Sequence, residues 1–114
     1  MENCLFCKII AGDIPSAKVW EDENCFAFRD INPQAPTHIL VVPKTHVANL
    51  TEAAQLPDNV LAAILRVIPQ IAAQEKLENG YRVVSNCGPD ACQSVQHLHF
   101  HILGGRQMAD SMRY

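Results

Sequence analysis

The segment HLHFHILGG, residues 97–105, places a histidine at every second position of an apolar run. Successive side chains of a β-strand point to opposite faces of the sheet. His97, His99 and His101 are therefore expected on one face, with the intervening hydrophobic residues on the other. Unpaired imidazoles are poor core residues, and strands more commonly bury Val, Ile or Thr. The pattern predicts a strand anchored to the core through one face, with a functional site on the other.

Around this strand, the chain predicts an α+β fold. Residues 4–11 pair apolar positions four apart, which favours a short helix ending at Gly12. A long helix begins at Pro57 and continues to residue 79, with a kink, or a junction of two helices, at Pro69. Five segments have the pattern of strands, at residues 18–21, 25–29, 38–42, 81–86 and 96–104. This order predicts a mostly antiparallel five-stranded sheet with one face open for a site.

The composition is that of a single domain over residues 1–114. The chain is 48% hydrophobic with a net charge of -3, so no basic surface for nucleic acid or an anionic membrane is expected. No apolar run approaches the roughly 20 residues of a membrane span. The N-terminus carries Glu2 and no basic region, unlike a signal peptide. Five cysteines, an odd number, argue against a disulfide framework, and we expect a cytoplasmic protein with reduced thiols.

Two kinds of chemistry suit three imidazoles on one face. They can bind a catalytic metal with an open position for water, or one can act as nucleophile while its neighbours bind an anion. The loop just upstream supplies Asn86, Gly88, Gln93 and Ser94. Because backbone amides and neutral polar side chains suit phosphate oxygens, this loop favours the second interpretation.

A second motif indicates structural zinc. Cys4 and Cys7 form a C-x-x-C pair, and His46 follows the predicted strand at 38–42. Two thiolates and two imidazoles make a tetrahedral zinc site, with His97 as the candidate fourth ligand. Alternatively, the two cysteines are small buried side chains on one helix turn. A thioredoxin-type redox pair fits less well, because no strand precedes the motif.

These motifs resemble the histidine-triad (HIT) family. Residues 97–103 carry its H-φ-H-φ-H-φ-φ signature. Three blocks agree in order, FCKIIAGDIPSAKVWED at 6–22, FRDINPQAPTHILVVPKTH at 28–46 and QSVQHLHFHILGGRQM at 93–108. The resemblance is to the zinc-containing, nucleotide-binding branch. It implies a homodimer, packed through its sheet or helices, that acts on purine nucleoside phosphoramidates and related mononucleotide esters.

The resemblance also implies roles for individual residues. His99 would attack the α-phosphorus and form a covalent nucleotidyl-histidine, His38 would help orient it, and Asp30 would bind the ribose hydroxyls. The phosphate would be held by His101, Asn86, Gln93 and Ser94, with Ser94 near the leaving group. An apolar slot for the base would be formed by Leu5, Phe6, Ile9, Phe28, Ile31 and Leu40. The family's metal ligands correspond to Cys4, Cys7, His46 and His97.

Two features depart from the family pattern. Cys92 stands in the substrate-binding loop where the family has glycine, so its side chain would narrow the pocket or add a redox-sensitive thiol. The C-terminus, MADSMRY at 108–114, differs from longer tails that reach the partner's active site. The leading hypothesis is a hydrolase acting through nucleotidyl-His99 without a catalytic metal. The alternatives are a nucleotide-binding adaptor with little turnover and a hydrolase whose metal is bound by all three histidines.

Overall fold

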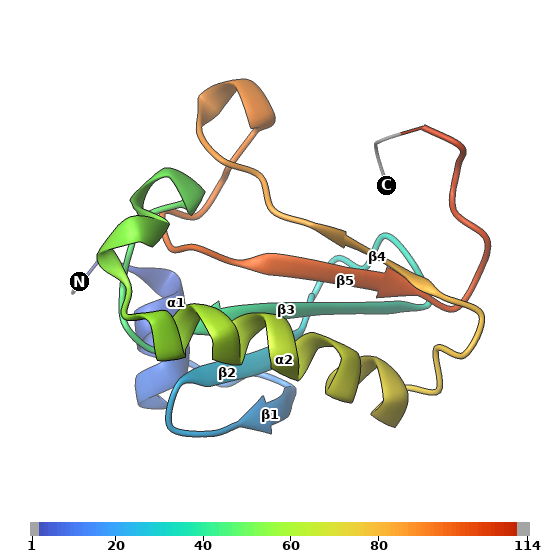
Figure 1. The fold of residues 1–114 in the computed structure, drawn as a ribbon, viewed down its shortest axis with the longest axis horizontal. Helices are drawn as coiled ribbons and strands as arrows, with labels where there is room; N and C mark the ends of the chain where they lie inside the picture. Colours follow the sequence, from blue (N-terminus) through green and yellow to red (C-terminus); the bar gives the residue numbers. More distant parts are fainter. Residues whose placement is uncertain (1–2, 112–114) are drawn as a thin grey trace.

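The structure, a computed structural model, describes residues 3–111. Within this range, five strands form one antiparallel sheet in the spatial order β1-β2-β3-β5-β4 (Figure 1). The strands are β1 (Lys18–Glu21), β2 (Cys25–Arg29), β3 (Thr37–Pro43), β4 (Tyr81–Val84) and β5 (Phe100–Gly104). The α+β architecture expected from the sequence is confirmed. The last part of the tail, residues 112–114, lies outside the described residues, as do Met1 and Glu2.

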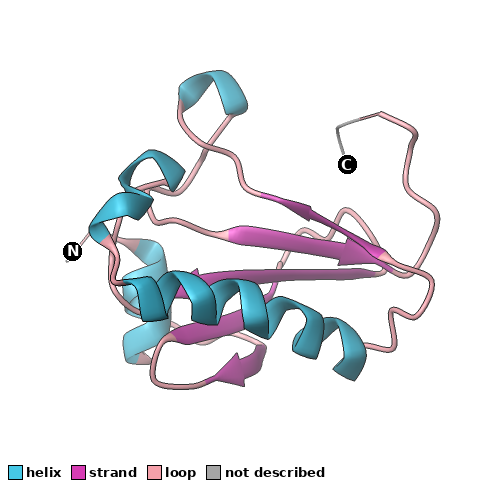
Figure 2. Ribbon diagram, viewed as in Figure 1, coloured by secondary structure: helices cyan, strands magenta, loops and turns pink. Residues whose placement is uncertain are grey.

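The described residues form α-helices and short 3-10 helices, drawn in cyan in Figure 2. The two α-helices are α1 (Leu5–Ala11) and α2 (Asp58–Gln74), and the short 3-10 helices are η1 (Leu50–Gln55) and η2 (Pro89–Ala91). α1 ends as predicted at Gly12, which adopts a left-handed φ of 85°. α2 passes through Pro69 as one helix, so two helices meeting there is wrong. Proline has no N–H, so the carbonyl four residues before Pro69 lacks its helical donor. Pro69 is exposed, and water can donate to that carbonyl instead.

α2 ends at Gln74, earlier than the predicted end at residue 79. The N–H of Leu77 donates to the carbonyl of Ala72 at 3.0 Å, and the N–H of Lys76 to that of Ala73 at 3.1 Å. Lys76 adopts a left-handed φ of 60°, so these bonds form a Schellman motif in which glycine is the usual residue. Lysine is not a residue that usually ends a helix. The apolar periodicity therefore predicted an end of α2 that is too late.

Two strands are shorter than predicted. β4 ends at Val84 and β5 begins at Phe100, whereas the sequence predicted 86 and 96. The residues just before β5 bond to other segments instead. The N–H of Leu98 donates to the carbonyl of Val47 at 2.8 Å, and the hydroxyl of Ser85 donates to the carbonyl of His99 at 2.8 Å.

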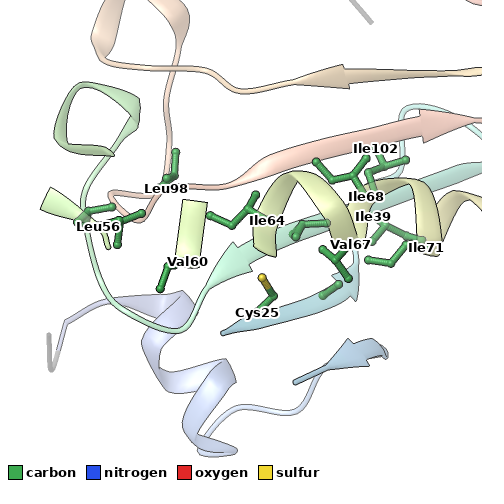
Figure 3. Packing of buried hydrophobic residues seen from close by; sticks show 13 residues of the cluster. Cys25, Ile39, Leu56, Val60, Ile64, Val67, Ile68, Ile71, Leu98 and Ile102 are labelled. Carbon is green, nitrogen blue, oxygen red and sulfur yellow. The ribbon is translucent and has the colours of Figure 1, made fainter. Parts of the chain in front are cut away.

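The two faces of the sheet carry different cores. α2 lies across one face (Figure 1), where its apolar side packs on alternate residues of β2, β3 and β5 (Figure 3). α1 lies on the opposite face, where Phe6 and Ile9 pack with Phe26, Phe28 and Leu40. No helix in residues 3–111 is both long and apolar enough to cross a membrane.

Strand register sets the position of the site. Leu40 of β3 pairs with His101 of β5, and Leu40 belongs to the core under α1. Paired residues of antiparallel strands share a face. His101 therefore faces the side of the sheet that α2 leaves uncovered, as the sequence predicts.

Candidate active site and metal centre

The three histidines share one face, as predicted. Leu98 and Ile102 lie in the core beneath α2, so the imidazoles that alternate with them point to the opposite side. His101 lies within β5, whereas His97 and His99 precede the strand. All three are buried, with relative exposures of 0% for His97, 6% for His99 and 8% for His101.

His97 lies against Cys4, Cys7 and His46. The ligand atoms of these four residues all lie within 4.8 Å of one another. His97 Nδ1 is 3.3 Å from Cys4 Sγ, 3.6 Å from Cys7 Sγ and 3.1 Å from His46 Nδ1. Cys7 Sγ is 3.3 Å from His46 Nδ1. The fold thus brings the four sequence-predicted metal ligands together from α1 and its N-cap, the loop after β3 and the segment before β5.

This donor set fits a tetrahedral zinc ion. Zn–S bonds of about 2.3 Å and Zn–N bonds of about 2.0 Å separate tetrahedral ligand atoms by about 3.3 to 3.8 Å, close to the separations here. His97 Nε2 lies 2.8 Å from the carbonyl oxygen of Pro43. Because a carbonyl only accepts, Nε2 carries the hydrogen and Nδ1 presents its lone pair to the cluster. Such a partner behind a histidine ligand is common in metal sites.

His99 is held in one orientation. Its Nδ1 lies 2.7 Å from the carbonyl oxygen of His97, so Nδ1 donates and Nε2 keeps a lone pair. Phe6 packs edge-on against the ring, with centroids 5.1 Å apart. Burial lowers the pKa of His99 below its ordinary value, although the bond to His97 acts in the opposite sense. The ring is therefore uncharged at neutral pH, with a lone pair on Nε2.

A chain of hydrogen bonds orders the protons of two further histidines. The N–H of Gln34 donates to His38 Nδ1 at 3.0 Å, so the hydrogen of neutral His38 is on Nε2. That atom lies 2.8 Å from His101 Nδ1 and 3.4 Å from Asp30 Oδ2. Donation to His101 Nδ1 leaves His101 protonated at Nε2. Burial lowers the pKa of both rings, that of His101 to about 4, so His101 is a neutral donor.

Asp30, His38 and His101 also bring ligand atoms within 4.8 Å of one another. Their hydrogen bonds make a metal site there unfavourable. His38 Nδ1 accepts from Gln34 and His38 Nε2 carries the hydrogen, so neither nitrogen of neutral His38 offers a lone pair to a cation. The hydrogen bonds among these residues instead fix which ring nitrogens of His38 and His101 carry hydrogen.

An apolar pocket of about 500 Å³ lies between α1 and the sheet. Its lining includes all six residues predicted for the base: Leu5, Phe6, Ile9, Phe28, Ile31 and Leu40. Ile31 is 93% exposed, so its side chain is accessible to a ligand that enters the pocket. The pocket also has lining residues that sequence reasoning missed: Pro15, Ser16, Ala17, Arg29, Asn32 and Val95.

A polar pocket of about 650 Å³ adjoins the apolar one. The two pockets share five lining residues: Asp30, Asn32, Ser94, His99 and His101. The polar pocket adds Gln34, His38, Val84, Asn86, Ala91, Cys92 and Gln93. A ligand that spans both pockets would therefore present its central part to the buried imidazoles.

Two residues of the loop at 86–94, Cys92 and Gln93, have features that a simple phosphate-binding side chain would not have. Cys92 lines the polar pocket with a left-handed φ of 60°, the conformation for which glycine is best suited. The side-chain amide of Gln93 donates to the carbonyls of Ala48 and Val95. Gln93 thus lines the pocket, but its side-chain donors are directed at the protein. Asn86 and Ser94 lie in the pocket lining as predicted.

Sequence reasoning missed Gln34 and Asn32. Gln34 acts through its main-chain N–H, a contribution for which the sequence carries no signal. Asn32 donates its N–H to Asp30 Oδ1 at 2.8 Å, and its place two residues after a candidate ribose ligand was the available clue.

Comparison with known proteins gives a consistent family. Residues 11–108 match the HIT domain. The 14 kDa zinc-binding protein of Zea mays is 55% identical over 106 residues, which cover 91% of this chain and 83% of the relative. Adenylylsulfatase HINT1 of Arabidopsis thaliana is 46% identical over 106 residues, covering 91% and 72%. The crystal structure of a HIT family hydrolase from Legionella pneumophila Philadelphia 1 has a TM-score of 0.87 at 49% identity, covering 95% of this chain and 97% of that one.

Proposed function

The chain belongs to the HIT family, as its histidine motif predicts, and we propose that it hydrolyses purine nucleoside 5′-phosphoramidates or related mononucleotide esters. The base occupies the apolar pocket, the ribose lies beside Asp30, and the leaving group enters the polar pocket. The phosphorus then lies near His99 and Ser94, which both pockets share. One relative is named an adenylylsulfatase, and adenylyl sulfate likewise joins an AMP moiety to a leaving group.

The orientation of His99 is the observation that carries this proposal. Its Nδ1–H is held by the carbonyl of His97, so its Nε2 lone pair attacks the α-phosphorus. A bond forms between His99 Nε2 and phosphorus as the bond to the leaving group breaks, and the leaving group takes a proton from a water molecule in the polar pocket. The hydroxide so formed attacks phosphorus, the Nε2–phosphorus bond breaks, and the mononucleotide and neutral His99 are released.

Neutral donors meet the charge on the phosphate oxygens. His101 would donate from Nε2, because its Nδ1 accepts from His38. Ser94 adds a hydroxyl near the leaving group. Fixed donors that need no reorganisation favour the charge distribution of the transition state. Asp30 offers its carboxylate to the ribose diol.

Zinc belongs to this proposal as a structural ion held by Cys4, Cys7, His46 and His97. The close approach of their ligand atoms supports it, as does the zinc-binding name of the maize relative. A bound zinc ion would cross-link three segments of the chain. The protein's own residues supply the proposed chemistry at phosphorus.

A homodimer, with α2 in the contact, is part of the same proposal. Leu65 of α2 and Tyr81 and Val83 of β4 are exposed hydrophobic residues, and exposed apolar surface is typical of interfaces. Mass photometry or light scattering at micromolar concentration tests it. A monomeric mass would contradict the dimer without affecting the proposed chemistry.

One alternative retains a specific observation in its favour. A nucleotide-binding adaptor with little turnover is consistent with the strained Cys92 in the substrate loop. By contrast, a metal bound by all three triad histidines is disfavoured. His97 directs one ring nitrogen at Pro43 and the other at the Cys4 thiol.

A hydrolysis assay separates these functions. The wild-type protein is expected to release AMP from adenosine 5′-phosphoramidate, and His99→Ala is expected to lose at least about 10³-fold in kcat/KM. Calorimetry with AMP shows whether the variant's pocket still forms. Full activity in His99→Ala would contradict the proposal, whereas AMP binding by an inactive wild type would support the adaptor.

A further inference from the structure

The side chain of Gln93 is fully engaged with main-chain groups of the protein. Its Nε2 donates to the carbonyl of Ala48 at 2.7 Å and to that of Val95 at 2.9 Å. Its Oε1 accepts the N–H of Gly88 at 2.8 Å. A carboxamide nitrogen has two hydrogens, so both donors are used. The reverse amide orientation would face an oxygen toward two carbonyls, which fixes the assignment.

These bonds join three segments of the chain. Gly88 lies near the start of the loop at 86–94, Val95 directly follows it, and Ala48 lies between β3 and η1. The main chain of Gln93 adds a fourth link, since its N–H donates to the carbonyl of Gly88 at 3.1 Å. The loop is therefore closed on itself and tied to the segment after β3 by one residue.

We propose that Gln93 is a positioning residue that holds the loop at 86–94 in its phosphate-binding conformation and makes no phosphate contact through its side chain. This inference rests on the proposed nucleotide site. A direct donor would have to surrender a bond to Ala48 or Val95, leaving a carbonyl without its partner. The clamp instead fixes where neighbouring Ser94 and the backbone amides of the loop lie.

The two roles predict different behaviour of the ligand-free protein. A clamp orders the loop before any nucleotide binds, so its removal speeds amide exchange in the absence of ligand. A direct phosphate donor acts only on the bound nucleotide, so its removal leaves the free loop unchanged. Hydrogen–deuterium exchange of peptides that cover the loop therefore distinguishes a clamp from a contact.

Gln93→Ala is the test variant, and Gln93→Met keeps the side-chain volume should the smaller residue fold poorly. Gln74→Ala is the matched control, because Gln74 is exposed at the end of α2. Without ligand, both Gln93 variants are expected to exchange the loop amides at least about tenfold faster, as the loss of three side-chain hydrogen bonds implies. Exchange in α2 and in Gln74→Ala is expected to match the wild type.

The affinities for AMP and adenosine give a second measurement, whose pattern a general loss of folding stability would not reproduce. AMP affinity is expected to fall about tenfold in the Gln93 variants, while adenosine affinity changes less than about twofold, because the base and ribose contact other elements. Unchanged exchange of the free loop would overturn the proposal, as would equal losses for AMP and adenosine. Neither measurement needs turnover, so absence of hydrolysis would refute the proposed reaction and leave the clamp tested.

Discussion

The ring of His99 donates from Nδ1 to the main-chain carbonyl of His97 at 2.7 Å. The side chain of His97 lies in the cluster with Cys4, Cys7 and His46. The proposed nucleophile is thus oriented by the backbone of a proposed zinc ligand. The alternation of residues 97–101 places both rings on the same side of the chain, two residues apart, where they contact different partners.

Loss of the zinc cluster is expected to destabilise the protein. Cys7→Ser should lose bound zinc and lower Tm by about 10 °C, since a zinc ion held by the cluster would cross-link three segments. Native mass spectrometry gives the zinc content, and a thermal melt gives Tm. Cys87→Ser is the control, because Cys87 contacts Thr51 at 3.3 Å, outside the cluster. Wild-type protein that carries no zinc after growth in zinc-supplemented medium would contradict the assignment.

Asp30→Asn is expected to weaken ribose recognition without altering the loop. Asp30 Oδ1 accepts the N–H of Asn32 at 2.8 Å, and an asparagine can keep that bond. Adenosine affinity should fall about tenfold, because hydrogen bonds to a charged acceptor are lost. The affinity for 2′,3′-dideoxyadenosine, which lacks both hydroxyls, should change little. Calorimetry with the two nucleosides measures the difference, and equal losses for both would argue against a ribose contact.

Acid is expected to destabilise the fold through the buried His101. Burial lowers the pKa of His101 from 6.5 to about 4. Between these two pH values, His101 is protonated in the unfolded chain and neutral in the folded protein. Its stabilising contribution is present above pH 6.5 and is lost as pH falls toward 4, by about 3 kcal/mol. Urea denaturation at a series of pH values measures this loss. His101→Asn should show a weaker pH dependence, and an identical dependence would contradict the assignment.

Cys92 is expected to store strain in its left-handed conformation. With φ at 60°, a side chain costs about 1 kcal/mol, a cost that glycine escapes. Cys92→Gly should therefore be more stable than Cys92→Ala by about 0.5 to 1 kcal/mol, although glycine ordinarily has the more flexible unfolded state. Denaturant titration of the two variants decides this. If Cys92→Ala is the more stable, the backbone is unstrained.

The sequence predicts the sheet well because its strands carry strong local signals. The predicted bounds at 18–21 and 25–29 match β1 and β2, where an acidic turn separates the two segments. The end of α2 was missed because Lys76 takes a role usual for glycine. β5 was predicted too long because the alternation already begins at His97 and His99, before strand pairing starts at Phe100.

The candidate site was predictable as a set of residues but not as a set of contacts. Spacing and family resemblance named the candidate metal ligands and the six apolar residues predicted for the base, which the fold brings together. The directions of hydrogen bonds depend on tertiary structure. Gln34 orients His38 through its backbone, and Gln93 turns its amide toward Ala48. Neither contact has a sequence signature, because any residue has an N–H and a glutamine can donate in many directions.

Covalent trapping of the substrate nucleotide is the most direct test of the central claim. Wild-type protein is mixed with adenosine 5′-phosphoramidate, quenched in alkali within one turnover, and analysed by intact and peptide mass spectrometry. The account predicts one added adenylyl group on His99, and no adduct in His99→Ala. An adduct on another residue, or AMP release during a single turnover with no adduct at any quench time, would contradict it.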